Sequence, residues 1–431
     1  MPRFTMTYNE EIIVDKVTTS LDIEVDNLVR LEEHRQLSQI SLVASENYSS
    51  PAIRFFEGSI FADKNAEGYP GRRCVSGCEY ADQLENLAIE RAKSAFGCEH
   101  ANVQAMSATI ANFAIMNELF QPSDVLMSMR LRDGGHLSHG APFHASGQNF
   151  RWCFYGVSET DEQLDYDEVR SIALENRPAA IICGGSSYPR LIDYEKMHQI
   201  ALEVEALLWV DLAHTAGLVA GCAIPSPFPH ADIVTTSTHK TLRGPRGGGL
   251  ILCKNSLAKQ IDRAIFPGLQ GAPKMDMIAA RAVLLSEVQT DRFREYARDV
   301  LRNAKALERG LVHAGVTLVS GGTSSHLLLL NVLRCGTTGS EIERLLMEAH
   351  VVANKNPIPF DTLSPSKAGG LRIGSAALTT RGLDEGQFVE LGGMIGKVVM
   401  SASNPHRVAD LRSFVEQNTQ GLPLFNRKWV A

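Results

Sequence analysis

A single lysine, Lys240, stands where a run of hydroxyl side chains meets a glycine- and arginine-rich turn. The stretch TTSTHKTLRGPRGGG covers residues 235–249 and continues an apolar segment. An amine at such a turn suits covalent catalysis, because a lysine amine forms a Schiff base with a carbonyl compound. An ordinary surface lysine is the alternative, so the neighbouring segments have to decide between the two readings.

Asp211 and His214 end a second apolar segment, WVDLAH, which we expect to lie in the same sheet. A carboxylate after Trp-Val needs a partner there, because burying an unpaired charge costs several kcal/mol. The protonated nitrogen of a pyridine ring is a suitable partner.

Small hydroxyl residues and a histidine follow two further apolar segments. Ser107, Ala108 and Thr109 lie in AMSATIANFAIM, between a predicted strand and a predicted helix. The free N–H groups and the dipole of a helix N-terminus bind phosphate, and a simple N-cap is the alternative. His136, in RDGGHLSHG, lies on a predicted loop, where an imidazole can stack on a flat ring.

Together these groups meet the needs of one cofactor, pyridoxal phosphate. It requires an amine for covalent attachment, an acid for its ring nitrogen, a phosphate cup and a stacking group. One lysine beside a histidine is weak evidence, whereas the whole set is specific. The sequence therefore predicts a pyridoxal-phosphate enzyme.

Short apolar runs separated by helical segments predict the sheet that positions these side chains. Runs that are apolar on both faces are typical of a mostly parallel, buried sheet in an open α/β sandwich, with the site at the carboxyl ends of the strands. The helical segment YADQLENLAIERAKSAFG should end at Gly97, a C-cap candidate. The six predicted strands are ANVQAM, DVLMSM, AAIICGG, ALLWVDLAH, ADIVTTST and GGLILCK.

We expect three parts in the chain. Residues 1–45 should form a helical arm, residues 46–295 a large domain and residues 296–431 a smaller C-terminal α/β domain. Strand candidates in the smaller domain are GVTLVSGG, HLLLLNVL and GGLRIGSAAL.

Composition narrows the classes of function. The 42 Lys and Arg residues against 49 Asp and Glu give a net charge of −7, so nothing favours nucleic acid or an anionic membrane as a partner. The eight cysteines include no CxxC pair, which argues against a metal site and for reduced thiols. The first residues carry acids where a signal peptide has an apolar core, and no apolar run approaches ~18 residues. We expect a soluble cytoplasmic protein that acts on a small molecule.

Many segments resemble serine hydroxymethyltransferases, in that family's order, from about residue 25 to about residue 400. The resemblance implies a fold-type I (aspartate aminotransferase-like) architecture in a homodimer whose active sites are each built from two subunits; dimer versus tetramer stays open. The matching segments are SLVASENYSSP, AEGYPGRR, GCEY, LAIERAK, GGHLSHG, VDLAHTAGLVA, TTSTHKTLRGPRGG, FPGLQG, NKN and LRIGSAALTTRG.

The resemblance also implies a role for each matched residue. Lys240 would hold the cofactor, Asp211 would keep the pyridinium proton, and Arg372 would clamp the substrate carboxylate through its guanidinium fork, assisted by Ser45. Glu67 matches the acid–base carboxylate that acts on the hydroxymethyl group. The other cofactor positions are Ser107, Ala108, Thr109, His136, Ser186, His214, His239, Gly271 and Ala272, with Arg246 supporting the surroundings of the lysine. The positions of the folate pocket are Leu131, Gly135, Leu137 and Asn356.

The chain departs from the family pattern around substrate, folate and phosphate. Cys74 and Val75 replace two tyrosines, of which one stacks on folate and the other contacts the reacting amino acid. The remaining departures are Asn65 for a tyrosine that reaches the phosphate of the neighbouring subunit, and Ser76, Ala108 and Ala272 for glycines.

These departures favour an altered substrate, because scattered drift would also affect the scaffold. Loss of two aromatic rings makes the pocket roomier and more apolar. A serine-like amino acid with an extra α-substituent, such as 2-methylserine, would fit, and weak folate stacking through Cys74 leaves the use of tetrahydrofolate open. Three alternatives remain: an ordinary serine hydroxymethyltransferase, another reaction type of this cofactor, and a non-catalytic relative.

Overall fold

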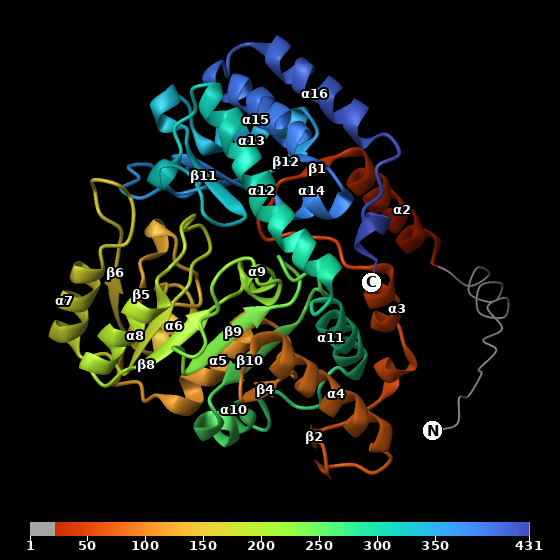
Figure 1. Cartoon of the computed structure of the whole chain (residues 1–431), viewed down its shortest axis with the longest axis vertical. Coiled ribbons are helices and arrows are strands. Elements are labelled where there is room, and N and C mark those ends of the chain that lie inside the picture. The colour runs from red at the N-terminus through yellow and green to blue at the C-terminus, as the bar shows by residue number, and fades with distance from the viewer. Residues whose placement is uncertain (1–21, 431) are drawn as a thin grey trace.

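The computed structural model describes residues 22–430 and has an α/β architecture built around a seven-stranded sheet (Figure 1). The strand order is β4-β10-β9-β8-β7-β5-β6, and only β10 runs antiparallel to its neighbours. Each predicted strand of this sheet is present. The strands are β4 (His100–Asn102), β5 (Val125–Met129), β6 (Arg151–Tyr155), β7 (Ala180–Cys183), β8 (Leu207–Asp211), β9 (Ile233–Ser237) and β10 (Gly249–Cys253).

Both faces of this sheet are buried, as the continuous apolar runs predict. Neighbouring side chains of one strand enter different cores: Leu208 and Val210 of β8 face one, and Trp209 faces the other. The first core is covered by α4 (Glu79–Phe96), α7 (Tyr166–Asn176), α8 (Tyr194–Glu203), α9 (Ala216–Ala220) and α11 (Met275–Glu287). The second is covered by α5 (Ala108–Leu119) and α10 (Ala258–Ile265).

The long helix α12 (Asp291–His313) joins this body to a C-terminal unit with a core of its own. Its first half, including Phe293 and Val300, packs in the core of the large sheet, whereas Leu307 and Leu311 pack in the second unit. The predicted boundary after residue 295 therefore falls inside one continuous helix. The unit contains the antiparallel strands β11 (Leu327–Asn331), β14 (Gly370–Gly374) and β13 (Asn354–Asn356), and the helices α13 (Gly339–Glu348), α14 (Ala376–Arg381), α15 (Glu385–Met400) and α16 (Pro405–Thr419).

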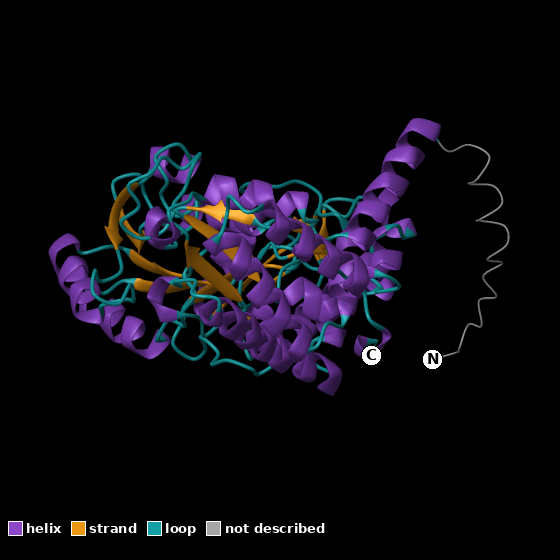
Figure 2. Cartoon of the chain, turned by 90° about the horizontal axis from the view of Figure 1, so that it is seen from above, coloured by secondary structure: helices purple, strands orange, loops and turns teal. Residues whose placement is uncertain are grey.

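The described part of the predicted N-terminal arm contains one helix, α2 (Ile23–Ser38); residues 1–21 lie outside the described residues. The helix buries none of its residues, and Figure 2 shows it projecting from the body. Its exposed apolar side chains are Ile23, Val25, Leu28, Val29 and Leu31. After it, β1 (Ile40–Ser41) pairs with β12 (Val351–Val352) and so joins the C-terminal unit. Between residues 22 and 430 no helix is long and apolar enough to cross a membrane.

The run GVTLVSGG and the strand β6 are among the elements that differ from the prediction. The run GVTLVSGG forms no strand: Leu318 makes an isolated bridge to Leu330, and a 3₁₀ turn follows at Val319–Gly321. Positive φ angles at Ser320, Gly321 and Gly322 turn the chain away from an extended course. The strand β6, which lies at an edge of the sheet with mixed exposure, was not predicted although it contains the unbroken apolar run of residues 152–155.

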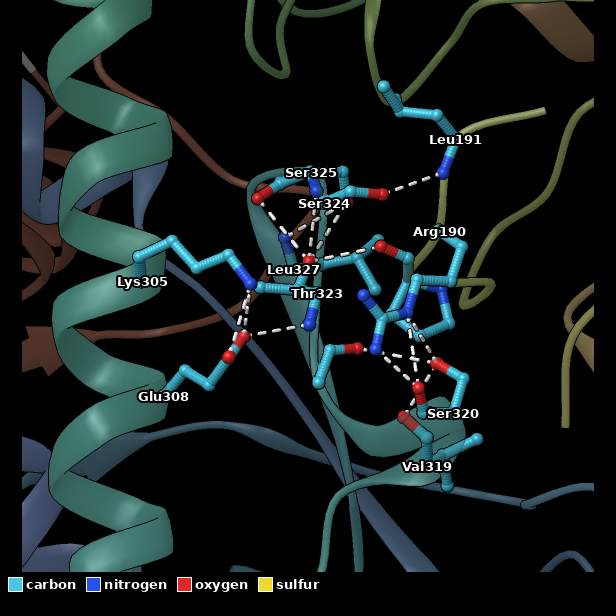
Figure 3. A network of polar contacts seen from close by, with 12 residues as sticks. Arg190, Leu191, Lys305, Glu308, Val319, Ser320, Thr323, Ser324, Ser325 and Leu327 are labelled. Carbon is cyan, nitrogen blue, oxygen red and sulfur yellow. Dashed lines mark hydrogen bonds and ion pairs between the residues drawn. The ribbon is translucent and has the colours of Figure 1, made fainter. Parts of the chain in front are cut away.

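The turn at Val319–Gly321 makes polar contacts with the loop after β7, and these contacts link the C-terminal unit to the large sheet (Figure 3). The Arg190 guanidinium donates to the carbonyl and hydroxyl oxygens of Ser320. Ser324 N donates to Pro189 O across 3.0 Å, and Leu191 N donates to Ser324 Oγ across 2.8 Å. The loop after β7 is thereby fixed to the C-terminal unit.

Candidate functional site

Lys240 lies in the turn after β9, where its backbone is held on two sides. Its carbonyl accepts from Asn47 Nδ2 at 2.9 Å and from Arg243 N at 3.0 Å. Burial, with added repulsion from Arg372 and Arg246 against the attraction of Asp211, lowers the pKa of the Lys240 amine to about 8. An amine with this pKa is partly neutral near neutral pH, which a nucleophile requires.

The glycines after Lys240 allow β10 to lie close to the first turn of α5. A methyl group on Gly249 would come within 2.7 Å of the Ser107 backbone, and one on Gly248 within 2.5 Å of Thr238 Oγ1. These short distances explain the glycines that follow the lysine. A side chain at position 249 would push β10 away from the N-terminus of α5, and one at position 248 would collide with Thr238.

Asp211 is the last residue of β8, and three donors hold its carboxylate. Oδ2 accepts from Asn112 Nδ2 at 2.9 Å and from His139 Nε2 at 3.0 Å, and Oδ1 accepts from Ala213 N at 2.9 Å. Burial acts to raise the pKa of Asp211, but the hydrogen bond and charge of His139 and the hydrogen bond from Asn112 hold it well below its usual value. The group is therefore an anion, as a partner for a ring N–H must be.

The sequence interpretation missed Asn112 and His139. Asn112 lies on α5, four positions after Ala108, and it is fully buried. His139 is the second histidine of GGHLSHG, so the available signal was a pair of histidines three positions apart.

His136 presents a neutral imidazole beside this carboxylate. Its Nδ1 accepts from Ser138 N at 3.2 Å and lies 2.8 Å from Ser138 Oγ, which fixes the ring. Burial, and then the charge of His139, lowers the pKa of His136 to about 3. A neutral flat ring suits stacking on an aromatic cofactor.

His214 and His326 form a second pair of neighbouring histidines. The His214 ring lies 5.5 Å from that of His326, at an interplanar angle of 24°. Burial, followed by the charges of Lys240 and Arg372, holds the pKa of His214 well below its usual value. Burial likewise lowers the pKa of His326 to about 3, and its Nε2 lies 3.1 Å from Ala44 O. Both rings are neutral; the sequence interpretation missed His326.

Ser107 caps α5 as the hydroxyl pattern predicts, since its Oγ accepts from Ile110 N at 3.1 Å. Ala108 and Thr109 form the first turn, where N–H groups are free for an anion. His239 adds a buried Nδ1 with no hydrogen-bond partner among residues 22–430. Burial, with the charge of Arg246, lowers the pKa of His239 to about 3. The imidazole is therefore neutral, and its Nδ1 can still form a hydrogen bond.

A cavity of about 720 Å³ opens between the large sheet and the C-terminal unit. Arg372, in the middle of β14, projects there, and its Nη1 donates to Ser186 O at 2.6 Å and to Ser186 Oγ at 2.9 Å. Burial lowers the pKa of Arg372 to about 10, which leaves it charged. The predicted residues that line this cavity are Leu131, Gly135, His136, Leu137, Ser186, Asn356 and Arg372.

The remaining predicted residues form a separate cluster that does not line this cavity. Glu67 and Cys74 flank the hairpin of β2 (Gly68–Tyr69) and β3 (Arg72–Arg73), and Cys74 N donates to Glu67 O at 2.8 Å. Val75 follows them, and Gly271 with Ala272 lies next to Glu67, since a methyl on Gly271 would be 3.7 Å from Glu67 Oε1. Figure 1 shows β2 and β11 at opposite ends of the molecule.

Arg73 makes this hairpin rigid. Its Nε donates to Asp82 at 2.8 Å and its Nη2 to Glu85 at 2.6 Å. Ser45 is half-buried in the loop after β1 and follows Ala44, whose carbonyl oxygen lies 3.1 Å from His326 Nε2. Within one chain Glu67 thus lies outside the lining of the cavity into which Arg372 projects.

The fold and the first cluster define a pyridoxal-phosphate-dependent transferase. The donor set fits that cofactor: an amine with a lowered pKa, an anionic carboxylate, a neutral ring, and a helix N-terminus whose first N–H groups are free. Among the described residues no group of histidines, cysteines and carboxylates could hold a metal ion.

The family follows from comparison with known proteins. The family model described as serine hydroxymethyltransferase matches residues 18–395, and the chain belongs to this family. It is 45% identical to the serine hydroxymethyltransferase of Koribacter versatilis over 423 residues, which are 98% of this chain and 97% of the relative. It is 46% identical to that of Nostoc punctiforme over 407 residues, 94% of this chain and 95% of the relative. The predicted family, fold class, cofactor and enzyme class are confirmed.

Proposed function

We propose that this enzyme makes and cleaves the Cα–Cβ bond of a serine-like amino acid that carries an α-substituent, of which 2-methylserine is the simplest. The observation that carries the proposal is the hairpin beside Glu67. Cys74 and Val75 are both exposed there, on a backbone that Arg73 holds rigid. Small side chains therefore stand at the two positions where the family pattern has tyrosine rings.

Glu67, Cys74 and Val75 do not line the cavity of their own chain, which supports a dimer in which the hairpin of one copy completes the cavity of the other. The exposed apolar side chains of α2 support an interface of this kind, because an apolar surface of that extent is rare on monomers. Oligomeric state and cytoplasmic location stay predictions.

In this arrangement each residue has a defined task. Pyridoxal phosphate, when bound through Lys240, supplies an electron sink for the pair left as the Cα–Cβ bond opens. Asp211 Oδ1 and Oδ2, held as an anion, keep the ring nitrogen protonated. Arg372 exchanges its contacts with Ser186 for the substrate carboxylate, which its fork binds bidentately. Glu67 of the second copy takes the proton of the β-hydroxyl group as the aldehyde leaves.

The use of tetrahydrofolate is the second question for this site. Leu131, Gly135, Leu137 and Asn356 all line the cavity, which favours folate as acceptor of the one-carbon unit. Cys74 offers no ring for stacking, which favours release of the free aldehyde.

A substrate panel tests the proposal. The purified enzyme is mixed with serine, 2-methylserine, threonine or glycine, with and without tetrahydrofolate, and aldehyde and product amino acid are quantified. We expect 2-methylserine to have the highest kcat/KM. A higher kcat/KM for serine would show that the enzyme is an ordinary serine hydroxymethyltransferase. A change in the cofactor spectrum without product would indicate a binding protein that has no activity.

A further inference from the structure

Arg243 is a buried arginine three positions after Lys240, and aromatic rings surround its charge. It is 2% exposed, and its Nε and Nη1 have no hydrogen-bond partner in the described part of the chain. Its Cζ lies 4.1 Å from the ring centroid of Tyr296, 5.0 Å from those of Phe293 and Phe425, and 6.0 Å from that of Trp429. Desolvated guanidinium–ring contacts of this kind are attractive.

The four rings, which we call the Arg243 cage, come from two distant segments. Phe293 and Tyr296 belong to α12, whereas Phe425 and Trp429 belong to the C-terminal segment, residues 423–430. That segment is anchored beside α14, because Trp429 Nε1 donates to Thr379 O at 3.0 Å. The Arg243 side chain therefore joins the lysine turn to two other parts of the fold.

The backbone of the turn shows why such an anchor matters. Arg243 has φ of 61°, the left-handed region that an arginine rarely adopts, and its N–H donates to Lys240 O. Tyr296 extends the link, since its hydroxyl lies 3.3 Å from Thr241 O and 2.8 Å from Asn47 Nδ2. Asn47 in turn donates to Lys240 O at 2.9 Å. The cage and the lysine carbonyl belong to one connected network.

We propose that Arg243 is a positioning residue: its caged guanidinium holds the turn of residues 240–243 against α12 and the C-terminal segment, and thereby fixes the direction from which the Lys240 amine enters the site. The inference rests on the assignment of Lys240 as the cofactor lysine. Arg243 contacts neither substrate nor cofactor in this scheme, and the C-terminal segment acts on the site through it.

The test compares Arg243→Met, Arg243→Lys and Phe425→Leu in the full-length holoenzyme. We measure the loss of the lysine-bound cofactor absorbance after dilution, amide hydrogen exchange of residues 239–246, and kcat and KM. Arg243→Met should lose cofactor at least about tenfold faster, exchange faster in the turn, and lower kcat more than it raises KM. Arg243→Lys should recover most of each value, and Phe425→Leu should lie between wild type and Arg243→Met. The matched control is Arg294→Met, an exposed arginine of α12 paired with Asp291.

The contrary outcomes are distinct. If Arg243→Met lowers the melting temperature but leaves turn exchange and cofactor loss at the wild-type level, Arg243 only stabilises the fold and the inference fails. If Arg243→Met does not fold, deletion of residues 422–431 and Phe425→Leu open the cage from its other side and decide the question by the same readouts. A Lys240→Ala enzyme that still bound cofactor covalently would overturn the assignment of Lys240 instead.

Discussion

His139, and not His136, is the histidine that contacts Asp211: its Nε2 lies 3.0 Å from Oδ2 of the carboxylate. Both histidines occur in GGHLSHG, yet they do different things. His139 forms a hydrogen bond with the Asp211 carboxylate and so orients it. His136 instead has its Nδ1 2.8 Å from Ser138 Oγ, and it lines the cavity. The motif thus combines an orienting and a stacking group within four residues.

The first prediction concerns that orienting bond. His139→Phe removes a donor to a buried carboxylate, a loss of about 1.5–3 kcal/mol, so pyridoxal phosphate should bind about 10–100-fold more weakly. Fluorescence titration of the apoenzyme measures the affinity. His139→Gln, which keeps a donor, should lose less; equal affinity of His139→Phe and wild type would mean that Asn112 and Ala213 suffice to hold Asp211.

The second prediction concerns covalent attachment. Lys240→Ala should leave a folded protein that yields no lysine–cofactor adduct after borohydride reduction, because the amine that forms the bond is gone. Mass spectrometry of peptides covers residues 235–249. Lys305→Ala, which changes an exposed lysine of α12 paired with Glu308, is the control and should keep the adduct. An adduct on another lysine would show that Lys240 is not the attachment point.

A site residue could be predicted from the sequence where one segment showed both its reactive side chain and its place at the end of a strand. Asp211 ends β8, Lys240 lies three residues after β9 and Ser107 five residues after β4, so residue type and strand end together predicted one edge of the sheet. His326 and Asn112 carry no such signal: one precedes a strand of the C-terminal unit, and the other lies inside a helix. Only the packing of these segments against β8 brings their side chains to the site.

Glu67 shows a second limit of prediction from the sequence. Sequence similarity placed it in the active site, yet within one chain it lies beside Gly271, outside the cavity that Arg372 lines. A motif gives a residue's chemistry but not which copy of the chain uses it. The strand predicted at GVTLVSGG failed for a different reason, because apolar alternation does not report the positive φ angles at Ser320 and Gly321.

The third prediction uses the lowered pKa of Lys240. With a pKa of about 8 in the folded protein against an ordinary lysine pKa of 10.5, the folded apoenzyme binds this proton more weakly than the unfolded chain does. Burying the charged amine thus destabilises the fold below pH 8 by up to about 3 kcal/mol, and the penalty disappears as pH rises from 8 to 10.5. Apo Lys240→Met should therefore be more stable than apo wild type at pH 7, and the difference should vanish near pH 10.5.

Urea unfolding of both apoproteins at several pH values measures that difference. Lys305→Met is the matched control, because its ammonium group lies at the surface and its substitution should give no pH-dependent difference. A constant stability difference between pH 7 and pH 10.5 would mean that the Lys240 amine is not desolvated in the apoenzyme.

The fourth prediction tests whether two copies share each site. Lys240→Ala and Glu67→Gln are each inactive in the shared arrangement, but a mixed dimer contains one site with both wild-type residues. The purified mixed dimer should therefore show about half of wild-type activity, because one of its two sites is intact. Activity is measured after co-expression of the two variants with different tags and purification through both. No recovery in a mixed dimer would place Glu67 and Lys240 in the same copy's site, or Glu67 outside the reaction.

The fifth prediction concerns substrate choice at the hairpin. Val75 is 38% exposed and stands where the family carries a tyrosine that contacts the reacting amino acid. Val75→Tyr restores a ring and a hydroxyl donor, so kcat/KM should rise for serine and fall for 2-methylserine, changing the ratio about tenfold, or roughly 1.4 kcal/mol. Ser76→Gly restores the neighbouring family residue without adding a ring, and should leave the ratio unchanged. If Val75→Tyr folds, binds cofactor normally and keeps the wild-type ratio, the residue at position 75 takes no part in choosing between the two amino acids.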